Sequence, residues 1–404
     1  MGFRECKGEH DVWMRDCGDH YEYVACYVDD LIVASKNPQG IIDTLGEVYK
    51  FRFKGTGEIN YHLGCDYFRD DEGTLCSAPL QYIARMNDSY VRIFGEEPKQ
   101  KWSSPLEKND HPELDTSELL DIEGIRIYMS MIGAAQWLVT LGRFDVQTAV
   151  MTLSSFRVAP RQGHLDRLKR VYGYVAKTSH ACIRFRTDEP DYSSITINDH
   201  DWTHTIYRDA KEQLPHDAPK ALGRRVVHTV YIDANLAHDY VTGKSCVGRL
   251  TFLNQTLVDH SSKKLATVET ATYGSEFGAG KIGVQSIQDD RNTLRYLGVP
   301  IEERSYMFGD NQSVVTSSTV PGSVLGKRHH LLAFHFIREA IAAKYIAFIF
   351  LPGYLNPADI VSKHWAYADV ADRLQAILYH QGDTAQLFDE DKHSTENETD
   401  NEEE

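Results

Sequence analysis

The sequence lacks several features that mark common protein classes. Its longest apolar run, 340–351, is interrupted by Lys344 and is shorter than the ~20 residues that span a bilayer. The first thirty residues carry charge throughout, unlike a secretory signal. The seven cysteines form no CxxC pair and show no ligand-like spacing with histidine, which indicates reduced intracellular thiols. These absences argue against a membrane partner and against a secreted, disulfide-stabilised fold.

An excess of basic residues is also missing. The chain has 43 Lys and Arg against 59 Asp and Glu, a net charge of −16, which at first sight argues against a nucleic-acid partner. Residues 381–404, however, hold ten acids and one base, so this stretch contributes −9 and the rest of the chain −7. Bulk charge is therefore weak evidence here, and local patches matter more. The same stretch is poor in apolar residues and is predicted to be disordered from about 381.

The 404 residues predict two or three domains of ordinary globular composition. Residues 21–30 and 31–35 read as two strands joined by a tight turn at Asp29-Asp30. The polar stretches 104–122 and 186–222 are interpreted as linkers, and 163–177 has the apolar spacing of a helix. From 226 onward, strand patterns alternate with helix patterns, which predicts an α/β fold with a mixed sheet. The expected strands are 226–232, 247–253, 305–308 and 345–351, and the expected helices are 267–297, 327–343 and one that opens at 357–365.

Four carboxylates lie at the ends of these expected elements. Asp233 and Asp310 follow strands, Glu276 lies early in a long helix, and Asp359 starts the last helix. Acids that converge on one sheet edge repel one another unless cations lie between them, and hard oxygen ligands select Mg²⁺ or Mn²⁺. For each acid alone, a turn or helix-cap role is an even alternative. Chemistry alone does not choose this set, because three other acids compete equally well: Asp239, Asp259 and Glu269.

A family resemblance makes the choice. The chain resembles the RNase H region of copia-type LTR retrotransposons from 226 to 366, through 231–239, 261–264, 270–277, 309–313, 327–330, 334–341 and 356–363. The resemblance implies that Asp233, Glu276, Asp310 and Asp359 are the catalytic, metal-binding carboxylates, and that two Mg²⁺ or Mn²⁺ ions are the cofactors. Glu276 is preferred to Glu269 because Glu-Phe-Gly-Ala fits the helix motif better. The chain departs from the family at Leu236-Ala-His, where the usual sequence is Trp-Ala-Gly.

The first half resembles the same family. Tyr27-Val-Asp-Asp30 resembles the reverse transcriptase YxDD motif, although two acids in a hairpin turn are common in any protein. Its context also matches the copia-type palm and the following thumb, at 2–6, 11–15, 21–24, 31–35, 63–64, 128–137, 142–143, 160–165 and 169–170. The resemblance thus covers about 1–185 and 226–366. The family's polymerase site needs another Asp upstream, so Asp29 and Asp30 are expected to be a polymerase remnant with DNA synthesis lost by truncation.

The predicted organisation follows from these matches. Residues 1–110 form a truncated reverse transcriptase palm, 111–185 a helical thumb or connection, and 186–225 a linker. Residues 226–366 form an RNase H-like domain and 367–404 an acidic tail.

Several basic residues are candidates for nucleic-acid binding. A helix face that could follow a phosphate backbone carries Arg161, Arg167, Lys169 and Arg170, and the alternative is an ordinary solvated face. Lys263, Lys264, Lys327 and Arg328 are candidate contacts within the RNase H-like region. His329, His330 and His335 lack partners at zinc-finger spacing, so packing or substrate contact is favoured over a closed zinc site.

The resemblance predicts two-metal hydrolysis of the RNA strand in an RNA–DNA hybrid, recognised through its 2′-hydroxyl groups. The expected partners are the hybrid, template RNA and the rest of the Pol polyprotein, at an intracellular location in cytoplasmic virus-like particles or the nucleus. Two alternatives stay open at this point. One is a catalytically inert transposon remnant, and the other is a non-catalytic nucleic-acid-binding module.

Overall fold

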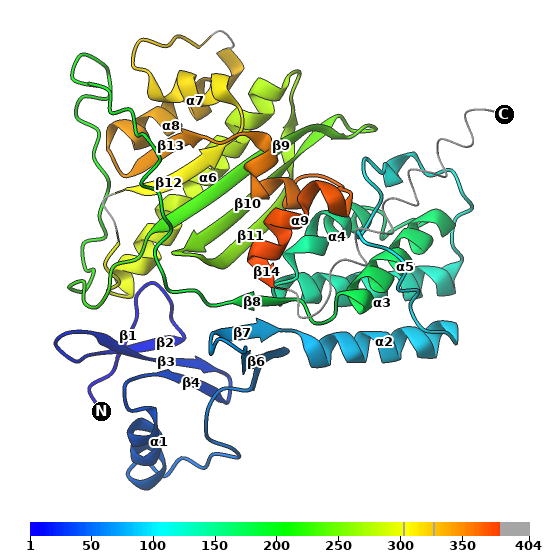
Figure 1. Ribbon diagram of the computed structural model, residues 1–404, viewed down its shortest axis with the longest axis horizontal. Coiled ribbons are helices and arrows are strands. Elements are labelled where there is room, and N and C mark those ends of the chain that lie inside the picture. The colour runs from blue at the N-terminus through cyan, green and yellow to red at the C-terminus, as the bar shows by residue number, and fades with distance from the viewer. Residues whose placement is uncertain (302–303, 326–327, 380–404) are drawn as a thin grey trace.

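The computed structural model describes residues 1–301, 304–325 and 328–379 of the chain. Three sheets and a group of helices make up this part (Figure 1). One mixed sheet carries helices on both sides, a small antiparallel sheet lies near the amino terminus, and a third sheet joins distant parts of the sequence. None of the described helices is long and apolar enough to cross a membrane.

The mixed sheet has the strand order β11-β10-β9-β12-β13. The first three strands form antiparallel hairpins, while β12 runs parallel to both β9 and β13. The parallel pairs are joined through helices, as parallel connections require. The strand bounds are His228–Asp239 (β9), Lys244–Leu253 (β10), Thr256–Val268 (β11), Ser305–Gly309 (β12) and Ile346–Phe350 (β13).

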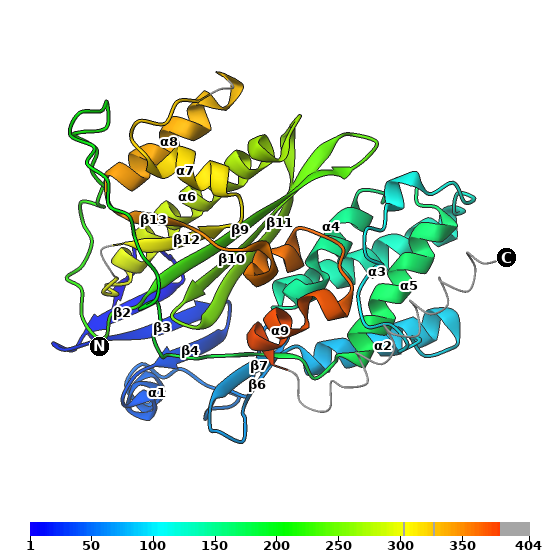
Figure 2. The same ribbon diagram turned by 45° about the horizontal axis from the view of Figure 1, so that its top comes forward.

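One face of this sheet is covered by three helices, which Figure 2 shows stacked above the strands. They are Thr272–Tyr296 (α6), Gln312–Thr319 (α7) and Leu331–Ala342 (α8). The long α6 lies directly on β9 because small residues line its inner face. A Cβ at Gly283 would come within 2.7 Å of the Met307 sulfur and 3.0 Å of Ile232. Helix and sheet thus share a core that includes Val230, Phe277 and Ile337.

The opposite face packs against the helical connection and the end of the described chain. The connection helices are Leu80–Phe94 (α2), Ile122–Thr140 (α3), Gln147–Ser154 (α4) and Gln162–Lys177 (α5). Short 3₁₀ turns occur at Pro112–Leu114 (η1), Phe144–Val146 (η2), Arg328–His330 (η3), Gly353–Leu355 (η4) and Pro357–Val361 (η5). One continuous apolar core joins Leu138 of α3, Leu168 of α5 and Leu250 of β10. The connection and the mixed sheet are therefore packed together.

Two smaller sheets complete the fold. The first has the order β1-β2-β3-β4 with bounds Arg4–Glu5, Val12–Asp16, Tyr21–Tyr27 and Asp30–Ala34, followed by helix Pro38–Glu47 (α1). The second has the order β14-β8-β7-β6-β5, with bounds Leu378–Tyr379, Cys182–Arg184, Leu75–Ala78, Cys65–Arg69 and Tyr61–His62. This second sheet pairs strands from the beginning, middle and end of the described chain.

The predicted acidic tail begins too early. Residues 367–377 form helix α9, which buries Tyr367, Val370 and Leu374 at helical spacing, and 378–379 form β14. The apolar stripe of α9 outweighs its two acids, so the segment packs instead of extending. The part predicted to be disordered, from about 381, lies outside the described residues.

Three further expectations need correction. β9 continues to Asp239, so Asp233 lies within the strand and not at its end. β11 was missed because its sequence from Asp259 to Lys264 is polar and shows no alternation, although backbone pairing with β10 forms it. The expected helix at 357–365 is only the short η5, and the regular helix comes later.

The segment 186–225 contains no helix or strand among its described residues, yet it is held in place by its side chains. Trp202 and Tyr207 are buried against Arg338 of α8, and Glu212 forms ion pairs with Arg291 and Arg295 of α6. The segment predicted to be a linker is therefore part of the packed structure.

Candidate active site

Three of the four predicted carboxylates meet at one end of the mixed sheet. Asp233 comes from the central strand β9, Glu276 from the start of α6, and Asp310 directly follows β12. One carboxylate oxygen from each lies within 4.8 Å of the other two. Asp233 and Glu276 are buried, at 1% and 7% exposure, and Asp310 is partly buried.

Local sequence explains how two of these positions are fixed. Asn311 caps α7, since its side-chain oxygen accepts from the Val314 amide at 3.1 Å, and this fixes the turn that carries Asp310. On the other side of β9, the Asn356 side chain donates to the Ile232 carbonyl at 2.9 Å and also caps η5. Gly248 on β10 allows that approach, because a Cβ there would lie 2.7 Å from the Ala358 carbonyl.

Asp359, the fourth predicted ligand, lies beside this group, but its carboxylate is paired with two basic side chains. Its carboxylate pairs with Lys363 at 2.5 Å and with Arg373 at 2.9 Å. The same Lys363 ammonium is 3.3 Å from Asp233. Asp359 is therefore linked to the cluster through Lys363, and it does not join the three acids that approach one another directly.

The electrostatics of the cluster show too much negative charge for its surroundings. Burial raises the pKa of Asp233 to about 6 and that of Glu276 to about 9, and the neighbouring carboxylates add to both shifts. Burial also raises the pKa of Asp310. Burial alone would lower the pKa of Lys363, but the Asp233 and Asp359 carboxylates outweigh it and raise that pKa. One ammonium group thus compensates these acids only in part.

The donor set fits a divalent cation. Three carboxylates supply hard oxygen ligands, and a cation among them would replace the protons that burial favours. They line a cavity of about 500 Å³ together with Asn311, Thr272 and Lys363. The group as arranged could hold one ion, whereas a second ion would require Asp359 to leave Lys363 and Arg373.

The three competing acids have other partners. Asp239 pairs with Lys264 at 2.7 Å, Asp259 pairs with Arg249, and Glu269 lies 3.4 Å from His330. None of the three belongs to the carboxylate group among the described residues. Tertiary structure therefore separates candidates that sequence chemistry left equal.

Three polar residues of the site were not given a role from sequence. Ser362 donates a hydrogen bond to Asp233, Lys363 bridges Asp233 and Asp359, and Arg373 holds Asp359. The i,i+4 spacing of Asp359 and Lys363 on a helical turn could have indicated their pairing. Arg373 was missed because its helix was interpreted as tail.

The predicted polymerase acids are arranged differently. Asp29 lies in the tight turn between β3 and β4, Asp30 is the first residue of β4 and pairs with Tyr27, and both acids are exposed. Val28 before them has a positive φ of 56°, an unusual conformation for a β-branched residue. Among the described residues, no further acid, histidine or cysteine joins them in a metal-ligating group.

The basic face of α5 is largely used within the protein. Arg167 pairs with Asp110 at 2.9 Å and with Asp115 at 2.7 Å, and Arg170 pairs with Glu107 at 2.7 Å. Arg161 donates to the Ser117 carbonyl, and the Lys169 ammonium lies 4.1 Å from the centre of the Phe94 ring. That this face follows a phosphate backbone stays a prediction, and the ion pairs of Arg167 and Arg170 do not favour it. Their ion pairs instead order the stretch 104–122 that was interpreted as a linker.

The other basic candidates divide into two groups. Lys263 is exposed on β11, and Arg328 is exposed before α8, so both stay candidates for substrate contact. Lys264 is mostly buried by its ion pair with Asp239, and Lys327 lies outside the described residues. His335 contacts the Tyr207 hydroxyl at 2.5 Å, and His330 lies beside Glu269 and the Phe277 ring.

The departure from the family motif at 236–238 is built into the packing. His238 is buried, contacts Thr152 of α4 at 3.0 Å and lies 3.1 Å from the Asn235 amide. The histidine thus contacts the connection helices, away from the carboxylates.

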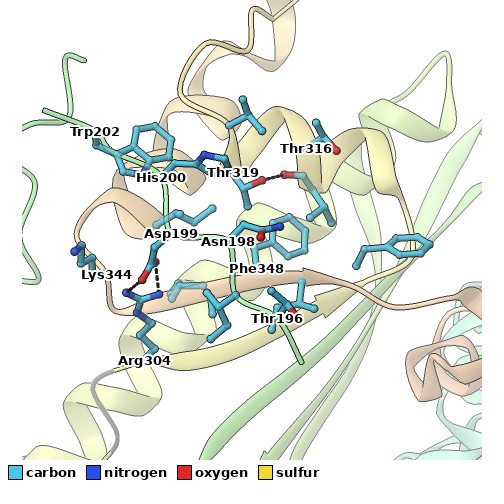
Figure 3. Close-up of a pocket in the computed structure, with 18 of the residues that line it drawn as sticks. Thr196, Asn198, Asp199, His200, Trp202, Arg304, Thr316, Thr319, Lys344 and Phe348 are labelled. Carbon is cyan, nitrogen blue, oxygen red and sulfur yellow. Dashed lines mark hydrogen bonds and ion pairs between the residues drawn. The ribbon is translucent and has the colours of Figure 1, made fainter. Parts of the chain in front are cut away.

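A second cavity, of about 320 Å³, lies between β13, α7 and the segment 196–202 (Figure 3). Asp199 and Arg304 form an ion pair at 2.6 Å on its wall, close to Lys344. This cavity shares no lining residue with the carboxylate cavity. It forms because the segment 186–225 covers the outer edge of the sheet.

Comparison with solved structures returns RNase H domains. The amino-terminal RNase H domain of a Mycobacterium tuberculosis protein matches 34% of this chain and 91% of its own length, at 16% identity and a TM-score of 0.26. RNase H1 of Halobacterium salinarum matches 36% of this chain and 99% of its own, at 14% identity and a TM-score of 0.27. No protein-family model matches the sequence.

Curated sequences give longer matches. The putative transposon Ty5-1 protein of Saccharomyces cerevisiae is 28% identical over 225 residues, which cover 55% of this chain and 67% of that protein. The Pol polyprotein of transposon RE1 from Arabidopsis thaliana is 22% identical over 367 residues, or 90% of this chain. The chain spans only 22% of that polyprotein's length. By sequence, this chain is a homologue of retrovirus-related Pol polyproteins from transposons.

Proposed function

We propose that this chain is an RNase H-type nuclease that hydrolyses the RNA strand of RNA–DNA hybrids with Mg²⁺ or Mn²⁺. Homology to Pol polyproteins supports a retrotransposon fragment of the RNase H type in general. The finer proposal is supported by one observation, the convergence of Asp233, Glu276 and Asp310 within 4.8 Å at the mouth of a cavity. Hybrid, template RNA and the remaining Pol polyprotein are the partners that follow from this proposal.

Each residue of the carboxylate cluster and its neighbours would have a distinct role. Asp233, Glu276 and Asp310 would hold the metal, which when bound activates water and stabilises the leaving oxygen of the phosphodiester. Ser362 and Lys363 keep the Asp233 carboxylate oriented. The Lys363 side chain is 39% exposed and borders the cavity, so its ammonium can also attract the substrate phosphate.

Asp359 is the residue that decides whether a second metal ion can bind. Its two cationic partners hold its carboxylate beside the first site, and substrate phosphate could compete with Asp359 for Lys363. We propose that Asp359 could help to hold a second metal ion only when its carboxylate is released from Lys363 and Arg373.

The direct test uses the full chain and an end-labelled RNA–DNA hybrid. Mg²⁺-dependent cleavage of the RNA strand is expected for the unmodified protein and should be lost in Asp310→Asn. Asp259→Asn is the matched control, because it makes the same chemical change on the same sheet at a residue paired with Arg249. If the unmodified protein binds the hybrid without cleaving it, a binding module is supported instead. If it does not bind and does not cleave the hybrid, an inert remnant is supported.

DNA polymerase activity is not part of the proposal. Asp29 and Asp30 lie at an exposed turn, and no third ligand approaches them among the described residues.

A further inference from the structure

A second metal-ligating group lies in the small sheet near the amino terminus. Cys17, His20 and Glu22 each offer one ligand atom, and these atoms lie within 4.8 Å of one another. Sequence spacing gave no sign of this group, since a single Cys-x-x-His pair does not match a finger. We infer that these three residues form a binding site for a borderline-soft divalent cation such as Zn²⁺.

The hairpin register brings the three side chains to one face. Arg15 pairs with Glu22 and Asp16 with Tyr21 across β2 and β3, and the Cys17 amide then donates to the His20 carbonyl at 3.0 Å. Residues opposite each other, and those two positions further along, share a face of an antiparallel pair. Cys17, His20 and Glu22 therefore point to the same side by the geometry of the turn.

His20 is prepared for ligation. Its Nδ1 contacts the Asp19 carboxylate, which also pairs with Lys36 at 3.1 Å. Its Nε2 is buried and has no hydrogen-bond partner among the described residues. Metal-bound histidines usually donate their other ring N–H to a carboxylate, which fixes the ring and its tautomer. A cation would satisfy the unpartnered nitrogen.

Glu22 is held in a similar way. One of its oxygens accepts from the Ser35 hydroxyl at 2.5 Å, and the other pairs with Arg15. Arg15 also donates to the Met1 carbonyl at 3.2 Å and stacks over the Phe3 ring at 4.7 Å. The guanidinium therefore keeps other contacts if a metal takes one carboxylate position.

The donor types select the metal. A thiolate, an imidazole and a carboxylate are typical zinc ligands, with bonds of about 2.0–2.3 Å, whereas Mg²⁺ requires oxygen. Three protein ligands leave a fourth position for water. Cys17 is exposed, so its side chain can adjust, and binding would release the thiol proton to solvent.

Co²⁺ is a suitable probe because only a thiolate ligand gives a sulfur-to-cobalt charge-transfer band. The reduced full chain should bind Co²⁺ with that band, and excess Zn²⁺ should abolish it. Carboxylates of the proposed nuclease site cannot produce the band, so this test is independent of the proposed function.

Variants locate the band. Cys17→Ser and His20→Asn should abolish it, while Cys26→Ser, on the same strand pair, should leave it unchanged. Asp19→Asn should keep the band but weaken Co²⁺ binding by about 10–100-fold, as for other partners of ligating histidines. Circular dichroism would check that each variant is folded. No band in the unmodified chain, or a band that survives Cys17→Ser, would overturn the inference.

Discussion

The buried carboxylates of the connection and those at the end of the mixed sheet have opposite surroundings. In the connection, Asp145 is 1% exposed and receives two parallel hydrogen bonds from Arg143, at 2.9 and 2.8 Å, and a third from the Tyr174 hydroxyl. At the end of the mixed sheet, Asp233, Glu276 and Asp310 approach one another, and Lys363 is the one nearby ammonium in the part of the chain that the structure describes. A buried acid with its own guanidinium stabilises the fold, whereas grouped acids with too little positive charge create a place for a cation.

The largest effect is expected in the connection. Asp145→Ala leaves the Arg143 guanidinium buried without its carboxylate, and removing one partner of such a pair typically costs about 3–5 kcal/mol of the free energy of unfolding. Urea unfolding would measure it. The exposed Asp166→Ala on α5 should change stability by less than about 0.5 kcal/mol. A similar small loss in both variants would remove the distinction between the two regions.

A smaller effect is expected for the residue that links the cluster to Asp359. Lys363→Met removes the ammonium that holds Asp233 and Asp359, and loss of such a supporting group typically lowers activity about 10–100-fold. Initial rates of hybrid cleavage at several Mg²⁺ concentrations would measure it. Because the variant also removes a competing cation, half-maximal activity should need less Mg²⁺. An unchanged rate would show that Lys363 is dispensable.

The pH dependence of stability should separate the two regions further. Burial raises the folded-state pKa of Glu276 from 4.5 to about 9, so between these values the folded state binds more protons than the unfolded state. Its contribution to stability is complete below pH 4.5 and is lost as the pH rises through about 9. Glu276→Gln should therefore raise the melting temperature at pH 8 more than at pH 5 in metal-free buffer. Added Mg²⁺ should stabilise the unmodified protein at pH 8 and stabilise the variant less. If Glu276→Gln changes the melting temperature equally at pH 5 and pH 8, the raised pKa of Glu276 is contradicted.

The smallest effect is expected at the exposed hairpin. Asp29→Asn and Asp30→Asn change acids that are solvated, so hybrid cleavage should not change and stability should shift by less than about 0.5 kcal/mol. Cleavage assays and thermal melts would measure both. A clear loss of cleavage would show that the turn contributes to substrate binding or to the nuclease site.

Sequence was sufficient for the parts of the fold that depend on local pattern. Helix α5 and strand β10 lie where apolar spacing predicts them, because each buries one regular stripe or run. Local pattern failed at β11, where pairing with β10 outweighs a polar sequence, and at α9, where the acids masked an apolar stripe. It also could not show that Arg167 and Arg170 are used in internal ion pairs, because their acidic partners lie more than fifty residues away.

For the candidate site, the sequence by itself determined which acids to consider, through motifs whose order and spacing match a known family. Only the tertiary structure decided which of them meet, because the distance between two side chains depends on strand register and helix packing. It joined Asp233, Glu276 and Asp310 from three elements and tied Asp359 to Lys363 and Arg373. Hairpin register likewise brought Cys17, His20 and Glu22 together, where spacing along the chain indicated nothing.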